Sequence, residues 1–70
     1  MAFYIPQLQV YAQPNYDYES GSTSYDIYAD GGLTNYYGTI SSYDGDFESD
    51  IEDMCENEIV EIFIDNNCYW

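Results

Sequence analysis

Residues 23–42 read TSYDIYADGGLTNYYGTISS, and this stretch indicates the class of fold. Within it, Tyr25, Ile27 and Ala29 alternate with their neighbours, which is the period of a half-buried strand. Asp26 and Tyr28 then share the opposite, outer face. The Asp-Gly-Gly that follows is typical of a tight turn, so residues 33–42 are expected to form the partner strand of a hairpin.

The flanking sequence predicts a further strand on the N-terminal side. Residues 3–12 (FYIPQLQVYA) alternate after Pro6, as a half-buried strand does. Pro6 lacks a backbone N–H, which suits an edge position or the start of a strand. Residues 13–22 (QPNYDYESGS) are rich in turn formers and are expected to be a connection. Gly38, inside the second hairpin strand, predicts a bulge or the close approach of another segment.

The C-terminal part changes its period. Residues 47–57 (FESDIEDMCEN) have apolar side chains at helical spacing and predict a short amphipathic helix. Asp46 is placed to cap this helix, and residues 49–52 form an alternative capping box. Residues 58–64 (EIVEIFI) are rich in β-branched and aromatic side chains and predict a last strand, with the tail at 68–70 packed back on the sheet.

Together these elements predict an α+β protein with a single domain over residues 1–70. The expected architecture is a small antiparallel sheet of about four strands in βββαβ order. One short helix packs on one face of that sheet.

The charge of the chain is entirely one-sided. It has 14 Asp and Glu, no Lys or Arg and no His, which gives a formal net charge of −14. Without cations the chain has nothing to contact phosphates or an anionic membrane, which excludes direct binding of nucleic acid or of a membrane surface. Hydrophobic residues make up 46% of the chain and aromatic residues 20%, a composition that favours a folded domain over a disordered one.

The cellular compartment is inferred from what the sequence does not contain. No stretch has the basic and apolar regions of an export signal or the length of a membrane span, so we expect a cytoplasmic protein. In that compartment Cys55 and Cys68 are expected to be reduced and half-buried. A disulfide between them is the alternative.

The chain offers few residues that are suited to catalysis or to metal binding. Without His or Lys there is no general base poised near neutral pH, so we expect no enzyme, no catalytic residue and no cofactor. Residues 44–50 (DGDFESD) resemble the start of a calcium-binding EF-hand loop, but Ser49 replaces its glycine and Cys55 its final glutamate. Two cysteines without histidine argue against zinc, and no metal site is expected.

Acidic and aromatic side chains are the remaining candidates for a binding site. Glu48, Glu52 and Glu56 recur every four residues and are expected to stack like charges on one helix face. Because one layer cannot bury all ten tyrosines, we expect several on the outer sheet face, with Tyr11, Tyr28 and one of Tyr36 or Tyr37 as the candidates. Tyrosine is frequent at interfaces. The simpler alternatives are a solvated acidic face and tyrosines that serve only as strand formers. The candidate partner-binding residues are Asp17, Glu19, Asp26, Tyr28, Asp30, Tyr36, Asp44, Asp46, Glu48, Asp50, Glu52, Asp53 and Glu56.

In size and charge the chain is similar to a short piece of duplex DNA. Duplex DNA carries one charge per ~1.7 Å, so a net charge of −14 equals about 24 Å of its length. Small size, acidity and the absence of cations resemble the DNA-mimic inhibitors of phages and mobile elements. That class includes the uracil-DNA glycosylase inhibitor, anti-restriction proteins and anti-CRISPR proteins. The resemblance covers the whole chain in composition and carries no motif.

The resemblance implies an inhibitor, and in the first place an anti-CRISPR. Such a protein would occupy the basic DNA-reading groove of a CRISPR effector in the cytoplasm of a host bacterium, as a monomer or dimer. A restriction enzyme or a DNA glycosylase is the alternative target. A second hypothesis is a protein-binding module that acts through its tyrosine-rich sheet face, with the charge serving solubility. A halophilic protein, which needs only that solubility, is a third.

Overall fold

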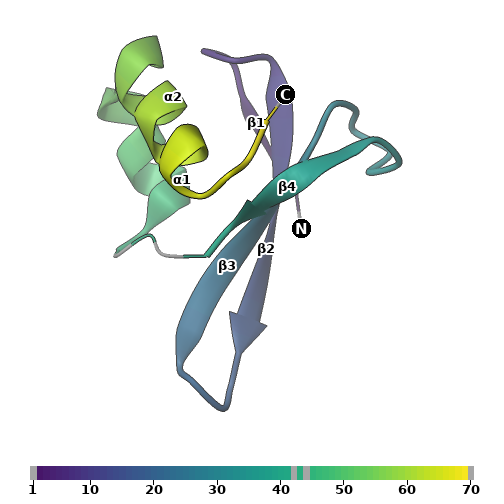
Figure 1. Ribbon diagram of the computed structural model, residues 1–70, viewed down its shortest axis with the longest axis vertical. Coiled ribbons are helices and arrows are strands. Elements are labelled where there is room, and N and C mark those ends of the chain that lie inside the picture. The colour runs from purple at the N-terminus through teal and green to yellow at the C-terminus, as the bar shows by residue number, and fades with distance from the viewer. Residues whose placement is uncertain (1, 42, 44, 70) are drawn as a thin grey trace.

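The computed structural model describes residues 2–41, 43 and 45–69, in which four strands are followed by helical segments (Figure 1). The strands form one antiparallel sheet in the order β1-β2-β3-β4. The predicted α+β class and four-stranded sheet are confirmed, but the βββαβ order is wrong because all four strands precede the helices. The elements are β1 (Phe3–Ile5), β2 (Val10–Asp17), β3 (Ser22–Tyr28), β4 (Tyr36–Ile40), α1 (Phe47–Asp50), the 3₁₀ helix η1 (Ile51–Asp53) and α2 (Glu56–Asp65).

The core lies between one face of the sheet and the helices that cover it (Figure 1). Phe47 and Ile51 enter it from α1 and η1, and Ile59 and Phe63 enter it from α2. Among the described residues no polar or charged one is buried, so hydrophobic burial dominates the stability of the core. The sheet contributes Ile5, Val10, Ala12, Tyr25, Ile27 and Ile40.

The strand predicted over residues 3–12 is in fact two strands joined by a tight turn. Residues 6–9 form the turn, in which the Leu8 N–H donates to the Ile5 carbonyl at 3.3 Å and Gln9 has φ 56°. Ile5 and Val10 pair across this turn and both point into the core. Because these two residues are five positions apart, the inward face changes from odd to even positions across the turn. Leu8, within the turn, has the same parity as Val10 and Ala12, which made the second strand look longer and concealed the turn.

The connection predicted over residues 13–22 is mostly strand. β2 continues to Asp17 and turns through residues 18–21 into β3, where the Gly21 N–H donates to the Asp17 carbonyl at 2.8 Å. Pro14 is tolerated because β1 pairs only with residues 10–12, which leaves this part of β2 with an open edge. The β2–β3 hairpin projects beyond the rest of the molecule (Figure 1).

The strand predicted over residues 58–64 is wrong, because this segment lies within α2. Ile59 and Phe63, one helical turn apart, are fully buried. Glu58, Glu61 and Asp65 are exposed and recur at spacings of three and four residues. Both sets follow the helical period, so packing of an amphipathic helix overrides the β propensity of the segment.

The helix predicted over residues 47–57 is shorter than expected. Met54 is extended (φ −94°, ψ 143°) and separates η1 from α2. Asp46 caps α1 as predicted, and its carboxylate accepts the Ser49 N–H at 3.4 Å. The alternative capping box at 49–52 lies inside the α1–η1 segment, where no helix begins.

α2 ends in a Schellman motif that returns the chain to the sheet. Asn67 is left-handed (φ 56°), and the N–H groups of Asn67 and Cys68 donate to the carbonyls of Ile64 and Phe63 at 3.0 and 2.8 Å. This turn buries Cys68 against β4, where a Cβ on Gly38 would lie 3.0 Å from the Cys68 Cα. The close approach predicted at Gly38 is confirmed, and the β3–β4 register also shifts at Ile27/Tyr28, opposite it.

The two cysteines are both free. The prediction that both are half-buried is wrong, because Cys55 is exposed and Cys68 is buried. Burial raises the pKa of the Cys68 thiol to about 11, so this thiol stays protonated near neutral pH. Cys68 packs back on the sheet as predicted, whereas Tyr69 is exposed and Trp70 lies outside the described residues.

The helical assignment of residues 56–65 predicts how two isoleucines respond to truncation. Ile59→Ala removes a fully buried side chain and should lower the free energy of unfolding by about 2–5 kcal/mol. Ile64→Ala, a matched control at a side chain that is 51% exposed, should change it by less than about 0.5 kcal/mol. Urea unfolding followed by circular dichroism measures both. Equal losses would contradict the observed helix face.

Candidate functional site

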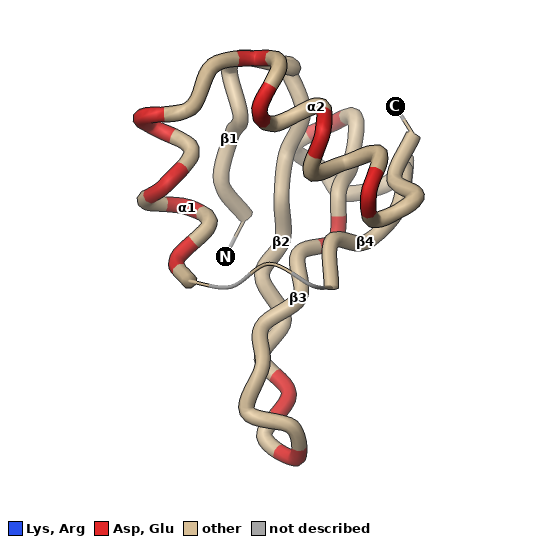
Figure 2. The backbone as a smooth tube through the Cα atoms, turned by 60° about the vertical axis from the view of Figure 1, so that its left-hand side comes forward, with Lys and Arg blue, Asp and Glu red and all other residues tan. Residues whose placement is uncertain are grey.

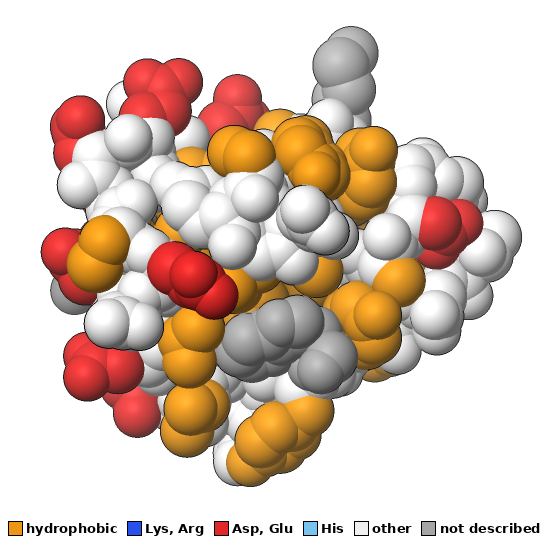
Figure 3. All heavy atoms as spheres, turned by 90° about the horizontal axis from the view of Figure 1, so that it is seen from above, with side chains coloured by type: hydrophobic (Ala, Val, Ile, Leu, Met, Phe, Trp, Pro, Cys, Tyr) orange, Lys and Arg blue, Asp and Glu red, His pale blue; other side chains and the backbone are white. Residues whose placement is uncertain are grey.

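Most of the carboxylates lie on the helical side of the molecule. Figure 2 shows them along α1, η1 and α2, and Figure 3 shows them gathered on the helical side when the molecule is viewed from one end. All the carboxylates of the helical segments are exposed to solvent. The chain has no Lys, Arg or His that could neutralise them. We call this set the acidic layer: Asp46, Glu48, Asp50, Glu52, Asp53, Glu56, Glu58, Glu61 and Asp65.

The predicted stack of Glu48, Glu52 and Glu56 is only partly correct. Glu48 and Glu52 lie one turn apart on the continuous α1–η1 segment. Glu56 lies beyond the break at Met54 and begins α2, so it does not continue that face. At the start of α2, Glu56 and Glu58 lie close to the positive end of the helix dipole, which favours their charge.

The candidate residues Asp17 and Glu19 lie away from the acidic layer, at the tip of the β2–β3 hairpin (Figure 2). The Asp17 carboxylate accepts the Glu19 N–H and the Ser20 hydroxyl, each at 3.0 Å. Asp17 therefore shapes the turn. Tyr16 and Tyr18 stack edge to face beside it at 4.8 Å between ring centroids, and both are exposed.

The sheet face that the helices leave uncovered carries a row of tyrosines, one from each strand. The cross-strand register places Tyr4 opposite Tyr11, Tyr11 opposite Tyr28, and Tyr28 opposite Tyr36. Ring centroids lie 4.9 Å apart for Tyr4 and Tyr11 and 5.5 Å apart for Tyr28 and Tyr36. We call this set the tyrosine row: Tyr4, Tyr11, Tyr28 and Tyr36.

Asp26 lies on the same face as the tyrosine row, as predicted, and is held by neutral donors. Its carboxylate accepts the Asn15 amide at 2.5 Å and the Thr39 hydroxyl at 2.8 Å. The Thr39 hydroxyl also forms a hydrogen bond with the hydroxyl of Tyr36. The half-buried carboxylate is therefore tied to the end of the tyrosine row, and the two form one surface.

Asp30 closes the loop between β3 and β4. One carboxylate oxygen accepts the N–H groups of Thr34 and Asn35 at 3.1 and 3.0 Å, and the other accepts the Thr34 hydroxyl at 2.8 Å. The hydrogen bond from the Thr34 hydroxyl has the largest effect on the carboxylate. Together with the backbone hydrogen bonds, it lowers the pKa of Asp30 from its usual value. The loop runs from residue 29 to 35 and is longer than the predicted tight turn.

The structure gives no support to a calcium loop at residues 44–50. Residues 47–50 are helical, Asp46 is occupied as a helix cap, and Asp44 lies outside the described residues. Asp50 accepts the Tyr43 hydroxyl at 2.5 Å. The pKa of Tyr43 is raised to about 12. Burial is the main cause, and the hydrogen bond to Asp50 and the negative charge of Asp50 add to it. Within residues 2–41, 43 and 45–69, no three acidic or cysteine side chains are grouped to hold a metal ion.

Twelve of the thirteen candidate residues therefore fall into four groups, namely the acidic layer, the hairpin tip, the sheet face and the Asp30 loop, and Asp44 lies outside the described residues. Sequence reasoning missed Glu58 and Glu61 because their segment was assigned to a strand, and it missed Asp65 because that residue was taken as the boundary of the strand. Their spacing of three and four residues was the available signal for a helix. Tyr4 was missed because residues 3–12 were predicted as one continuous strand, whereas they form β1, a turn and the start of β2.

Comparisons with known proteins find no relative from which a function could be transferred. No protein-family model matches the chain, and neither the curated proteins nor the solved structures contain a match. Among the described residues, no helix has the length and apolar character needed to cross a membrane.

The Asp30 loop predicts a pH-dependent stability difference. The pKa of Asp30 is lower in the folded protein than in the unfolded chain, so the ionised carboxylate stabilises the fold. This stabilisation is present above about pH 4 and is lost as the pH falls through the pKa of the folded state. Asp30→Ala should therefore lower the thermal midpoint at pH 7, and the gap to the parent protein should narrow below pH 4. Asp53→Ala, at an exposed carboxylate of η1, is the control. A gap that is independent of pH would contradict the assignment.

Proposed function

We propose that this protein is a stoichiometric DNA-mimic inhibitor that binds the basic groove of a nucleic-acid-binding protein. The observation that carries the proposal is the acidic layer in a chain with no Lys, Arg or His. Within the class we infer an anti-CRISPR of the host bacterial cytoplasm, because CRISPR effectors hold DNA in a basic channel. The protein acts by binding and is not an enzyme.

The dimensions of the molecule support this proposal. Its longest extent is 31 Å. A duplex of that length carries about 18 charges at one per ~1.7 Å, compared with a net charge of −14 here. The protein therefore presents a similar charge over a similar length. A groove lined by Lys and Arg would attract it at long range and bind it rapidly.

The tyrosine row supports a second candidate function, a module that binds a protein partner away from any DNA site. Tyr4 and Tyr36 are 46% and 54% exposed at the two ends of the row. Tyrosine gives large contact area at low entropic cost and stacks on Arg through its ring. In this case aromatic contacts hold the partner and the carboxylates serve mainly solubility.

Two sets of variants separate these functions. The probes are a purified CRISPR effector, a restriction enzyme and a DNA glycosylase, each tested for binding to its own duplex in a gel-shift assay. We expect the protein to displace duplex from one of them, and its affinity to fall on the order of 10²-fold or more between 50 and 200 mM salt. The triple variant Glu56→Gln, Glu61→Gln, Asp65→Asn should weaken inhibition more than Tyr28→Ala does.

The opposite ranking would contradict mimicry and favour the tyrosine row. So would a complex in which the target binds this protein and its duplex together. Circular dichroism of each variant is the control for folding. The triple variant alters only exposed side chains of α2, so we expect it to fold.

A further inference from the structure

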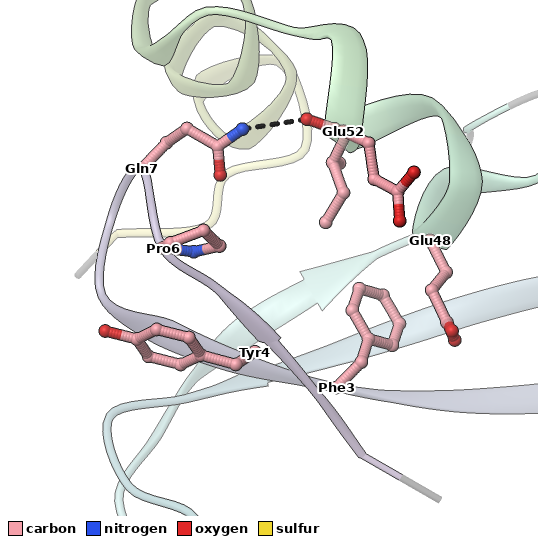
Figure 4. A pocket seen from close by; sticks show the side chains of 7 residues that line it. Phe3, Tyr4, Pro6, Gln7, Glu48 and Glu52 are labelled. Atoms are coloured by element: carbon pink, nitrogen blue, oxygen red, sulfur yellow. Dashed lines mark hydrogen bonds between the residues drawn. The ribbon is translucent and has the colours of Figure 1, made fainter.

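A pocket of about 400 Å³ opens at the β1 edge of the sheet, between the sheet and the α1–η1 segment (Figure 4). Tyr4 and Pro6 line one side, and Glu48 and Glu52 lie on the opposite wall. It joins the two surfaces described above, because Tyr4 ends the tyrosine row and the two glutamates belong to the acidic layer. The remaining lining residues are Phe3, Gln7 and Ile51.

The pocket has an apolar lining and polar groups that mainly accept hydrogen bonds. The Gln7 amide nitrogen donates to the carbonyls of Ile51 and Met54 at 2.8 and 3.1 Å, which uses both of its hydrogens. Since both partners are acceptors, the orientation of the amide is fixed. Its oxygen is buried and has no hydrogen-bond partner among the described residues. Because that oxygen is buried, the acceptors that the pocket presents to a ligand are the exposed carboxylates of Glu48 and Glu52.

The two glutamates repel one another in the free protein. They lie four residues apart on one helical segment, an arrangement that destabilises a helix when the charges are alike. The chain has no Lys or Arg that could neutralise them. A cation that enters between them from outside the chain would relieve this repulsion.

We propose that this pocket receives an arginine side chain of the protein partner. The guanidinium has five N–H donors and no acceptor, which complements the two carboxylates. Its aliphatic stem packs on Phe3 and Ile51, which line the pocket on the side of the sheet that the helices cover. The inference deepens the proposed function by naming the group that a basic partner would insert between the sheet and the helices.

The test uses the free protein and three blocked tripeptides, acetyl-Gly-Xaa-Gly-amide, in which Xaa is arginine, lysine or citrulline. Citrulline matches arginine in shape and lacks its charge. Titration is followed by ¹H–¹⁵N NMR. We expect the arginine peptide to shift the Gln7 side-chain amide and the backbone signals of residues 3–7, the lysine peptide to bind more weakly, and citrulline to have no effect.

Variants assign the site. Glu48→Gln with Glu52→Gln should weaken arginine binding about tenfold or more, since charge-assisted hydrogen bonds are lost. Glu58→Gln with Glu61→Gln removes the same charge from α2 and should change binding by about twofold or less. The pocket variant should also have a higher thermal midpoint than the parent, because its like-charge repulsion is gone. Should the double variant fail to fold, Glu52→Gln alone serves the same comparison.

Equal binding of citrulline, equal loss in both double variants, or shifts confined to α2 would overturn the proposal. The outcome is independent of DNA mimicry, because the titration involves no target protein. An arginine site can therefore stand if no duplex is displaced, and inhibition can stand if the pocket binds no arginine.

Discussion

Fourteen carboxylates with no Lys, Arg or His in the same chain are the constraint on which the rest of this structure depends. A buried carboxylate needs a paired charge, and this chain has no cationic side chain to provide one. Among the described residues the core is accordingly free of charged side chains, and every carboxylate except Asp26 and Asp30 is exposed. The short helices carry most of this charge on the side that faces solvent.

Neutral donors take the place that cations hold in other proteins. Asp17, Asp26 and Asp30 accept hydrogen bonds from backbone N–H groups, hydroxyls and an amide. Asp46 and Asp50 do the same with a helix N–H and a tyrosine hydroxyl. Such bonds stabilise turns and a helix end without reducing the net charge. The field of the protein therefore remains available to a partner.

Much of the sheet could be predicted from the sequence, because alternation and turn residues are local. The inward face of Tyr25 and Ile27, the Asp46 cap and the close approach at Gly38 all follow from such patterns. The prediction of a strand over residues 58–64 was wrong because a short apolar run suits either a buried strand or a buried helix. Its packing against the sheet, through Ile59 and Phe63, decides for the helix, in agreement with the three- and four-residue spacing of its exposed acids.

The candidate site was less accessible, since it depends on contacts between distant segments. Sequence reasoning found the acidic residues near 48–56 but had no means to place residues 3–7 beside them. The turn at 6–9 and the Gln7 bonds to Ile51 and Met54 create that neighbourhood. The tyrosine row likewise needs the register of all four strands.

The central claim is that the acidic layer occupies a surface that otherwise holds nucleic acid. Carbodiimide cross-linking tests it most directly, because it joins carboxylates to amines and this chain has no lysine of its own. Applied to the complex with a target protein and read by mass spectrometry, it should join carboxylates of α1, η1 and α2 to target lysines that contact DNA. Added duplex should remove these links. Links confined to target lysines outside the DNA site, or unchanged by duplex, would contradict the account.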